Sequence, residues 1–345
     1  MAKTTEKELT LTDSKMIQGM AALAMLCLHL FDRYDYYGLY SPFIFVKGLP
    51  LCFYFGQLSD FCVMGFAFCS GYAHMKLFES YHDYYPRRLK SLLRLIIQYW
   101  VVICVFSLVS IAVGQGERMP GDAATVFGNV FLYDISYCGA WWYMYVYVLL
   151  VILSPLLLRC TRKMNSALLL FLGFIIYCGA YYLRFHIQTT NLLVGKLGPF
   201  GMTLFEYMLG SVFYKEKWFS RGFAVWKRIK RELRIPFSCC IVVLLMLLRT
   251  LVVPNLFFAP VSGVIIITLF FFWEKPACIE KLFLFIGSHS TNIWLTHMFF
   301  YLYMFSNLVY IGKYPPVIFA CLLGITIVVS GLLQLLQRPV VKWIK

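Results

Sequence analysis

The stretch that decides the fold runs from Ser14 to Arg33 and reads SKMIQGMAALAMLCLHLFDR. Its part from Met16 to Phe31 carries no formal charge, and such an apolar run is typical of a helix that crosses a membrane. One polar side chain, His29, stands near the far end of this run. Burying an imidazole in lipid costs free energy, so such a residue often marks a function, and hydrogen-bonded packing is the alternative.

The composition of the chain agrees with this interpretation. Hydrophobic residues make up 61% of the 345 residues and charged residues 14%, which leaves more apolar surface than a soluble core can bury. The apolar runs are continuous and do not alternate, a pattern that argues against a transmembrane β-barrel. Helices are the remaining way to satisfy the backbone in lipid. We therefore predict an all-α, polytopic membrane protein.

About ten membrane spans can be placed along the chain. They are Met16–Phe31, Leu58–Leu77, Leu92–Val113, Trp141–Leu158, Ala167–Leu183, Leu197–Tyr214, Ile235–Val253, Leu256–Trp273, Leu282–Phe305 and Pro316–Leu336. Pro254, between two of them, marks either a tight turn or a kink. The segment Pro42–Gly56 is apolar but short and interrupted by Gly48 and Pro50, which favours an interfacial or re-entrant stretch.

The basic residues predict the orientation of these spans. With the N-terminus inside, most of the 31 lysine and arginine residues fall in cytoplasmic segments, as the positive-inside rule requires. We therefore expect both termini in the cytoplasm. The longest polar connections, Gln115–Gly139 and Lys215–Arg234, are too short to bury a core of their own. Residues 1–345 are thus predicted to form a single integral-membrane domain, with residues 1–14 as a polar cytoplasmic tail.

The net charge of +15 does not require nucleic acid as a partner. It lies mostly in the predicted inner loops, where anionic membrane lipid is the default partner. Lys227–Arg234, with the sequence KRIKRELR, is most simply an anchor that fixes topology. Most of the 12 cysteines lie in apolar runs without metal-ligand spacing, so we predict no metal site and no bound cofactor. Cys52 and Cys138 lie in outward segments, but nothing compels them to pair.

The most informative polar cluster follows the second span. That span contains FCVMGFAFCSGYAHM, in which Gly65 and Gly71 would let helices approach closely. The segment YYPRRLKSLLRLIIQYW comes next and carries Arg87, Arg88, Lys90 and Arg94. Guanidinium groups bind phosphate in a bidentate manner, so this cluster suits an anionic ligand that enters from the cytoplasm. Anchoring at the membrane edge is the alternative.

Together these segments resemble the membrane-integral acyltransferases of type 3, which modify cell-envelope and other extracytoplasmic glycans. The resemblance covers most of the chain. It rests on the first span, where IQGMA from Ile17 leads to His29; on FAFCSGY at 66–72; on Arg94 at the entry to the third span; on AWWY at 140–143; and on the late stretch 287–297, which ends in Leu-Thr-His.

The sequence departs from the family pattern at two positions. The family often has an arginine ten residues or so ahead of its histidine, whereas this chain has Gln18. The family's paired arginines are separated by two residues, and here Ser91 stands where the first would be. Lys90, Arg88 or Arg87 would have to supply the missing charge.

The resemblance implies acyl transfer from a cytoplasmic acyl-CoA, acetyl-CoA above all, to a hydroxyl of an extracytoplasmic or lipid-linked glycan. His29 is the candidate general base, because a neutral imidazole can take the hydroxyl proton as the oxygen attacks the thioester. A covalent acyl-histidine is the alternative route. Arg87, Arg88, Lys90 and Arg94 are the candidate acyl-donor site. Supporting candidates are Gln18, Trp142, Glu206 and His297, although an aromatic belt explains Trp142 and structural hydrogen bonding is favoured for His297.

Three further expectations complete the prediction. The protein is expected in the cell membrane, the bacterial inner or plasma membrane, as a multi-pass protein of unknown oligomeric state.

The competing function is a transporter or flippase of a lipid-linked glycan, which would also explain ten spans and buried polar residues. That class predicts a repeated half with matching interrupted spans, and the sequence has no such repeat. His74, near an inner loop, is expected to be solvated.

Overall fold

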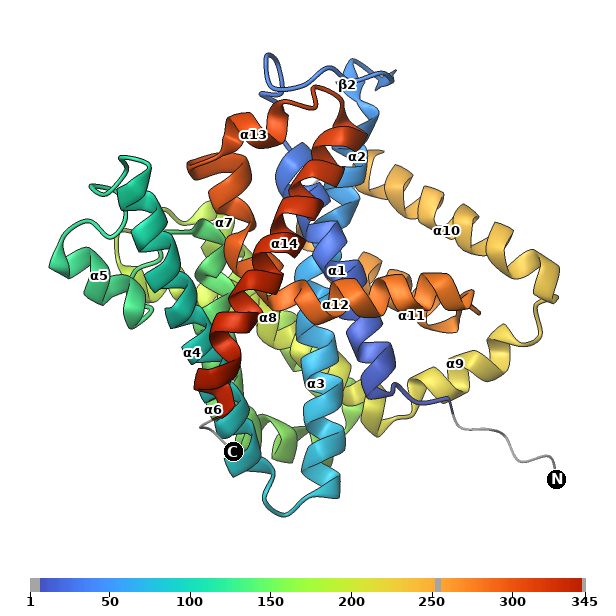
Figure 1. Cartoon of the computed structure of the whole chain (residues 1–345). Coiled ribbons are helices and arrows are strands. Elements are labelled where there is room, and N and C mark those ends of the chain that lie inside the picture. The colour runs from blue at the N-terminus through green and yellow to red at the C-terminus, as the bar shows by residue number, and fades with distance from the viewer. Residues whose placement is uncertain (1–6, 252–255, 343–345) are drawn as a thin grey trace. The chain divides into compact units, whose positions relative to one another are not determined.

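The computed structural model describes residues 7–251 and 256–342 and is built almost entirely of helices (Figure 1). The long helices are α1 (Leu11–Phe31), α3 (Cys62–Ser80), α4 (Tyr84–Ala112), α6 (Trp142–Lys163), α7 (Ser166–His186), α8 (Leu192–Lys215), α10 (Arg231–Leu251), α11 (Ala259–Phe272), α12 (Ala277–Met298) and α14 (Pro315–Lys342). The short helices are α2 (Leu51–Leu58), η1 (Ser59–Phe61), α5 (Ala123–Val130), η2 (Gly139–Trp141), α9 (Trp218–Trp226), η3 (Leu256–Phe258), the π-helix η4 (Phe299–Tyr303) and α13 (Ser306–Tyr310).

The helices confirm an all-α membrane protein. Seven helical segments among the described residues are long and apolar enough to cross a membrane. They are Leu11–Phe31, Leu51–Ser80, Tyr84–Ala112, Gly139–Lys163, Ser166–His186, Arg231–Leu251 and Pro315–Lys342. The other three predicted spans fall on α8, the shorter α11, and α12 with η4. The total of ten and the cytoplasmic position of the termini remain predictions, and the turn or kink at Pro254 lies outside the described residues.

The prediction that Pro42–Gly56 is an interfacial or re-entrant stretch is wrong for its second half. Strands β1 (Phe45–Val46) and β2 (Leu49–Pro50) form a two-residue antiparallel hairpin. Lys47 and Gly48 turn the chain with positive φ angles of 49° and 80°, as a tight hairpin requires. From Leu51 the chain is helical and continues through η1 into α3, so this stretch lengthens the second span.

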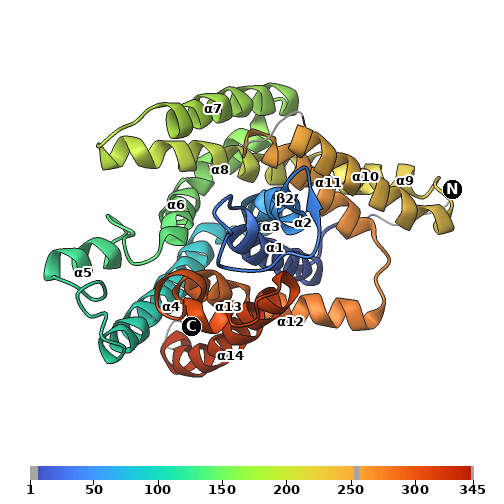
Figure 2. The ribbon, with the colours of Figure 1, turned by 90° about the horizontal axis from the view of Figure 1, so that it is seen from above.

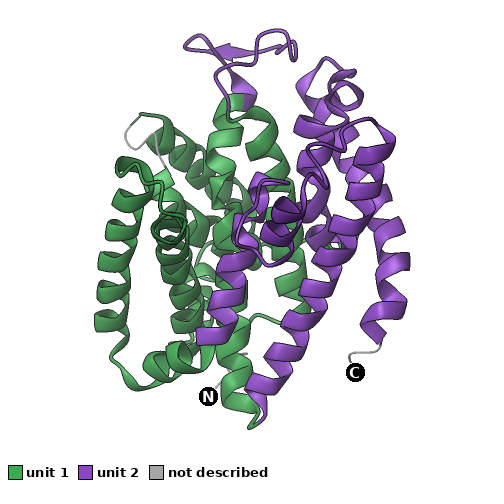
Figure 3. Cartoon of the chain, turned by 90° about the vertical axis from the view of Figure 1, so that its left-hand side faces the viewer, with its two compact units in different colours: residues 1–32, 53–82, 154–288 green, residues 33–52, 83–153, 289–345 purple. Residues whose placement is uncertain are grey.

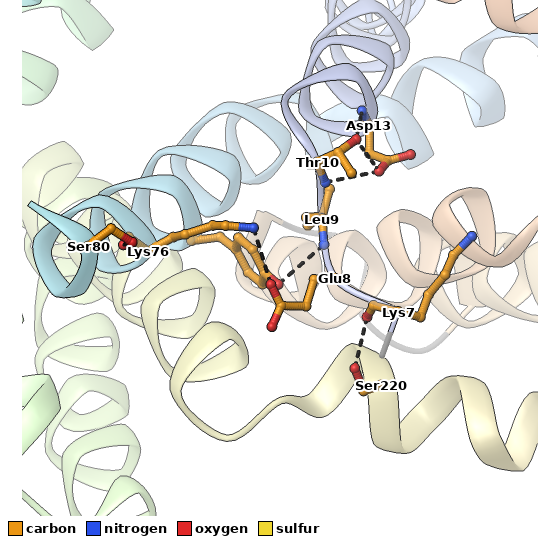
Figure 4. A network of polar contacts seen from close by, with 9 residues as sticks. Lys7, Glu8, Leu9, Thr10, Asp13, Lys76, Ser80 and Ser220 are labelled. Carbon is orange, nitrogen blue, oxygen red and sulfur yellow. Dashed lines mark hydrogen bonds and ion pairs between the residues drawn. The ribbon is translucent and has the colours of Figure 1, made fainter. Parts of the chain in front are cut away.

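The predicted polar tail of residues 1–14 includes the first residues of α1, which begins at Leu11. Thr10 and Asp13 form a capping box that satisfies free N–H groups of the first turn. The segment before it is held by the Tyr72 hydroxyl, which accepts a bond from the Leu9 N–H at 3.3 Å, and by an ion pair of Glu8 with Lys76 at 3.1 Å (Figure 4). Glu8 and Leu9 are therefore held against α3, and the Lys7 carbonyl oxygen accepts from the Ser220 hydroxyl of α9 at 3.1 Å.

The chain divides into two compact units, shown in different colours in Figure 3. Unit 1 comprises residues 1–32, 53–82 and 154–288, and α3 packs there against α1 and α8. A Cβ on Gly71 would collide with the Tyr207 carbonyl oxygen of α8, and a Cβ on Gly65 would meet the Ala21 side chain of α1. The close helix approach predicted for these two glycines is thus confirmed. Figure 2 shows α7 alongside α8 in the same unit.

Unit 2 comprises residues 33–52, 83–153 and 289–345. Its core forms around Trp141, whose side chain is fully buried and packs edge-on against Tyr99 at 4.7 Å between ring centroids. The C-terminal α14 contacts α4 and is joined to α12 by a reciprocal amide pair of Asn292 and Gln337 at 3.1 and 3.2 Å. Buried amides that satisfy each other in this way fix the register of neighbouring helices.

Candidate active site

His29 lies in the last turn of α1, within unit 1. Its side chain is partly exposed, whereas its neighbour Leu30 is completely buried. The helix ends at Phe31, because the Asp32 backbone leaves the helical conformation at φ −78° and ψ 65°. The Asp32 N–H still bonds to the Leu28 carbonyl oxygen, and Gly56 of α2 packs against the backbone of Asp32. A partly exposed imidazole at the end of a well-held helix can meet a substrate and keep a defined position.

A buried ion pair lies next to the end of this helix. Asp60 comes from η1, which packs against α1, and Arg249 comes from α10. The Asp60 Oδ2 accepts bonds from the Arg249 Nε at 3.0 Å and from its Nη2 at 2.8 Å. Asp32, three residues after His29, also interacts electrostatically with Arg249. The end of α1 is therefore surrounded by charge that was not predicted from the sequence.

Glu206 on α8 belongs to the same unit and is almost fully buried. Its Oε2 has no hydrogen-bond partner among the described residues, and the same holds for Oδ1 of Asp60. The two carboxyl groups interact electrostatically. Gln18 lies on α1 eleven residues before His29, on the same helix face and about 16 Å away along the axis.

The candidate acyl-donor residues lie in unit 2, in the first turns of α4. Arg87 is turned outward and forms an exposed ion pair with Asp83 at 2.8 Å. Arg88 differs, because its Nε is buried without a hydrogen-bond partner among the described residues. Its charge interacts electrostatically with Tyr147 of α6. Lys90 is exposed and Arg94 is half-buried. Among these four basic residues, Arg88 is therefore the one whose buried donor atom has no hydrogen-bond partner in the described ranges.

The two remaining supporting candidates also lie in unit 2. Trp142 is half-buried and packs edge-on against Tyr143. His297 is completely buried, and its Nδ1 donates to the carbonyl oxygens of Ile293 at 3.2 Å and Trp294 at 2.9 Å in its own helix. These contacts fit the structural alternative for His297.

Two buried histidines have structural partners. His74 of α3 was expected to be solvated, but it is buried and its Nδ1 lies 2.9 Å from the Tyr207 hydroxyl of α8. That expectation is wrong because α8 covers this face of α3. His289 of α12 lies 2.8 Å from the Ser330 hydroxyl of α14. Cys52 and Cys138 are not joined in a disulfide, and the Cys52 thiol donates to the Tyr40 hydroxyl at 3.8 Å. No group of three or more potential metal-binding side chains occurs in the described ranges.

The protein is a multi-pass helical membrane protein that carries a partly exposed histidine and a buried ion pair. Polar groups of this kind in membrane helices usually serve a function. Residues 13–335 match the family described as the acyltransferase domain. The chain therefore belongs to the type 3 acyltransferase family and is a membrane acyltransferase. Comparisons with curated proteins and with solved structures each found no similar protein.

Proposed function

We propose that this acyltransferase moves an acyl group, acetyl above all, from cytoplasmic acyl-CoA to a hydroxyl of an extracytoplasmic or lipid-linked glycan in the cell membrane. The observation that carries the proposal is His29, a partly exposed imidazole within a membrane helix of a chain from an acyltransferase family. An imidazole that is not fully enclosed at the end of a well-held helix can be reached by a substrate.

The reaction requires one proton to move from the acceptor to the leaving group. His29 takes the proton of the acceptor hydroxyl as its oxygen attacks the thioester carbonyl, so that the C–O bond forms. The C–S bond of the donor then breaks, and the imidazolium returns the proton to the CoA thiolate. In the alternative route, His29 itself carries the acyl group before the hydroxyl attacks.

Two features of the chain support this chemistry. The ion pair of Asp60 with Arg249 ties α10 to η1, which packs against α1, and so supports the turn that carries His29. Arg88 is the leading candidate for a donor phosphate, because its buried Nε has no hydrogen-bond partner in the described part of unit 2. A phosphate oxygen would satisfy this donor with a charge-assisted hydrogen bond.

The direct test is acyl transfer by the full chain in membrane vesicles that carry cell-envelope glycans. We expect isotope-labelled acetyl-CoA, supplied on one side, to label glycan hydroxyls, as mass spectrometry of the glycans would show. Vesicles without the protein are the control. Movement of a lipid-linked glycan across the vesicle membrane without any acylation would contradict the proposal and favour the transporter or flippase.

A further inference from the structure

The groove between α10 and α11 is not used by the proposed reaction. It has a volume of about 750 Å³, lies wholly within unit 1, and is open on one side. Apolar side chains form most of its wall, from Val242 of α10, Ile266, Leu269 and Phe270 of α11, and Met20 of α1. Its volume falls within the range of about 300–1,000 Å³ that is usual for pockets that hold small ligands.

The groove exists because half of α10 stands away from its neighbours. The buried residues of α10 are Leu245 and Arg249, both in its second half, where Arg249 is held by Asp60. From Arg231 to Leu244 the described side chains are at least partly exposed. α10 is one of the helices long and apolar enough to cross a membrane, so its apolar open stretch after Arg234 would face hydrocarbon. An apolar groove at that depth suits a lipid chain, because water would find no polar partners there.

The length of the groove fits one leaflet. Its wall on α10 runs from Arg231 to Val243, twelve residues further along, which is about 18 Å of helix. Half of a typical hydrocarbon core is about 15 Å. One acyl chain that enters from the Arg231 end would therefore reach the middle of the membrane and stop.

The basic segment beside that end favours an anionic headgroup. Arg231, Glu232, Arg234 and Glu274 line the mouth, where Glu274 accepts from Arg234 at 2.9 Å and from Arg231 at 3.0 Å. The adjoining segment 227–234 carries five basic side chains against one acidic one. Arg231 and Lys230 remain largely exposed beside the mouth. This excess of positive charge is complementary to an anionic headgroup.

We propose that the groove between α10 and α11 binds one acyl chain of an anionic phospholipid, whose headgroup lies against the basic segment 227–234. The site is separate from the proposed acyl-transfer residues. It gives KRIKRELR a specific ligand in addition to its role as a topology anchor.

The test uses the full chain, purified in detergent and incubated with equal amounts of phosphatidylglycerol and phosphatidylcholine. Native mass spectrometry should show one retained lipid, with phosphatidylglycerol strongly preferred. Replacing both Lys230 and Arg231 with glutamine should lower that preference by about fivefold per lost charge, the ratio that corresponds to about 1 kcal/mol each. Equal retention of the two lipids by the unaltered protein would overturn the proposal.

A matched pair of variants locates the site. Val242→Trp places a large side chain in the groove and should abolish retention. Leu244→Trp changes the same helix at a side chain that is 64% exposed and outside the groove, and should retain the lipid. Loss of lipid from both variants, undiminished retention by Val242→Trp, or a lipid-free dimer that covers the groove would each contradict the proposal.

Discussion

Asp60 and Arg249 form an ion pair in which both side chains are at least 95% buried, although 189 residues separate them in the sequence. The pair joins α10 to η1 and thereby to the end of α1. Removing two charges from water costs several kcal/mol, which their attraction repays only while both partners are present. The pair therefore makes the placement of α10 strongly dependent on either residue.

We expect Arg249→Met to destabilise the protein by about 3–5 kcal/mol, because Asp60 is then left buried and uncompensated. The double variant Asp60→Asn with Arg249→Met should recover much of this loss. Thermal unfolding in detergent measures both. Arg221→Met is the control, since Arg221 is exposed and lies 4.0 Å from Glu216, and such surface pairs contribute about 1 kcal/mol or less. A similar loss for Arg221→Met and Arg249→Met would contradict the prediction.

Arg88 and Arg87 are adjacent but differ in their contacts. Arg88→Gln should weaken acyl-CoA binding by about ten- to a hundredfold, because a charge-assisted bond to phosphate contributes about 1.5–3 kcal/mol. Arg87→Gln should have a smaller effect, since Arg87 already pairs with Asp83. Binding of acyl-CoA to the two purified variants is the measurement. Unchanged donor affinity in Arg88→Gln, together with poorer membrane insertion, would favour the anchoring alternative.

Trp141 and Trp294 make reciprocal bonds that join η2 to α12, with indole N–H groups donating to Leu295 and Ala140 carbonyl oxygens at 3.0 Å each. Trp141→Phe leaves the Leu295 carbonyl without this donor, and we expect a cost of about 1–3 kcal/mol. Trp142→Phe should cost less, because Trp142 is only half-buried. Thermal unfolding of the two variants compares them, and an equal loss would show that the indole bond of Trp141 contributes little.

The helices could be predicted from the sequence because length and hydropathy are local properties. The second half of Pro42–Gly56 could not, because Leu51–Leu58 is too short to be recognised as a span and becomes one only through its continuation into α3. The close packing at the two glycines of α3 was predicted correctly, because small residues between membrane helices mainly serve to let the helices approach closely.

The candidate site could be predicted only in part. Asp60 and Arg249 are each a charged residue inside a predicted span, which by itself indicates a special role. The local sequence does not indicate that the two residues pair with each other. The four basic residues of α4 were found as a cluster. Arg88 interacts electrostatically with Tyr147, whereas Arg87 pairs with Asp83. This difference depends on how α6 packs, and the spacing of the basic residues in the sequence does not reveal it.

Lys275 provides a test by pH. It follows α11, and its Nζ donates to the carbonyl oxygens of Phe270 at 2.6 Å and Trp273 at 3.0 Å. Burial lowers its pKa from 10.5 to about 8, with Lys7 also lowering it and Asp13 and Glu280 opposing the shift. Between pH 8 and 10.5 the unfolded chain therefore binds more protons at this residue than the folded one. The contribution of Lys275 to stability must rise with pH across that window and be most unfavourable below it.

Lys275→Gln should accordingly show a shallower rise of melting temperature between pH 8 and 10.5 than the unaltered protein. Lys281→Gln, at an exposed position of α12, is the control and should follow the unaltered protein. Parallel melting curves for Lys275→Gln and the unaltered protein across the window would show that Lys275 titrates alike in both states.

The mechanism depends most on His29, and His74 supplies its control within the same unit. His29→Gln should insert normally and lose acyl transfer by about 10²- to 10⁴-fold, because glutamine keeps hydrogen-bonding capacity but cannot take a proton near neutral pH. Acyl-CoA binding should persist, because the proposed donor residues are on α4. His74→Gln can still bond to Tyr207, so it should retain transfer even if it unfolds at a lower temperature. Glycan acylation close to normal in cells with well-inserted His29→Gln would remove His29 from the mechanism and make Glu206 and His297 the next residues to test.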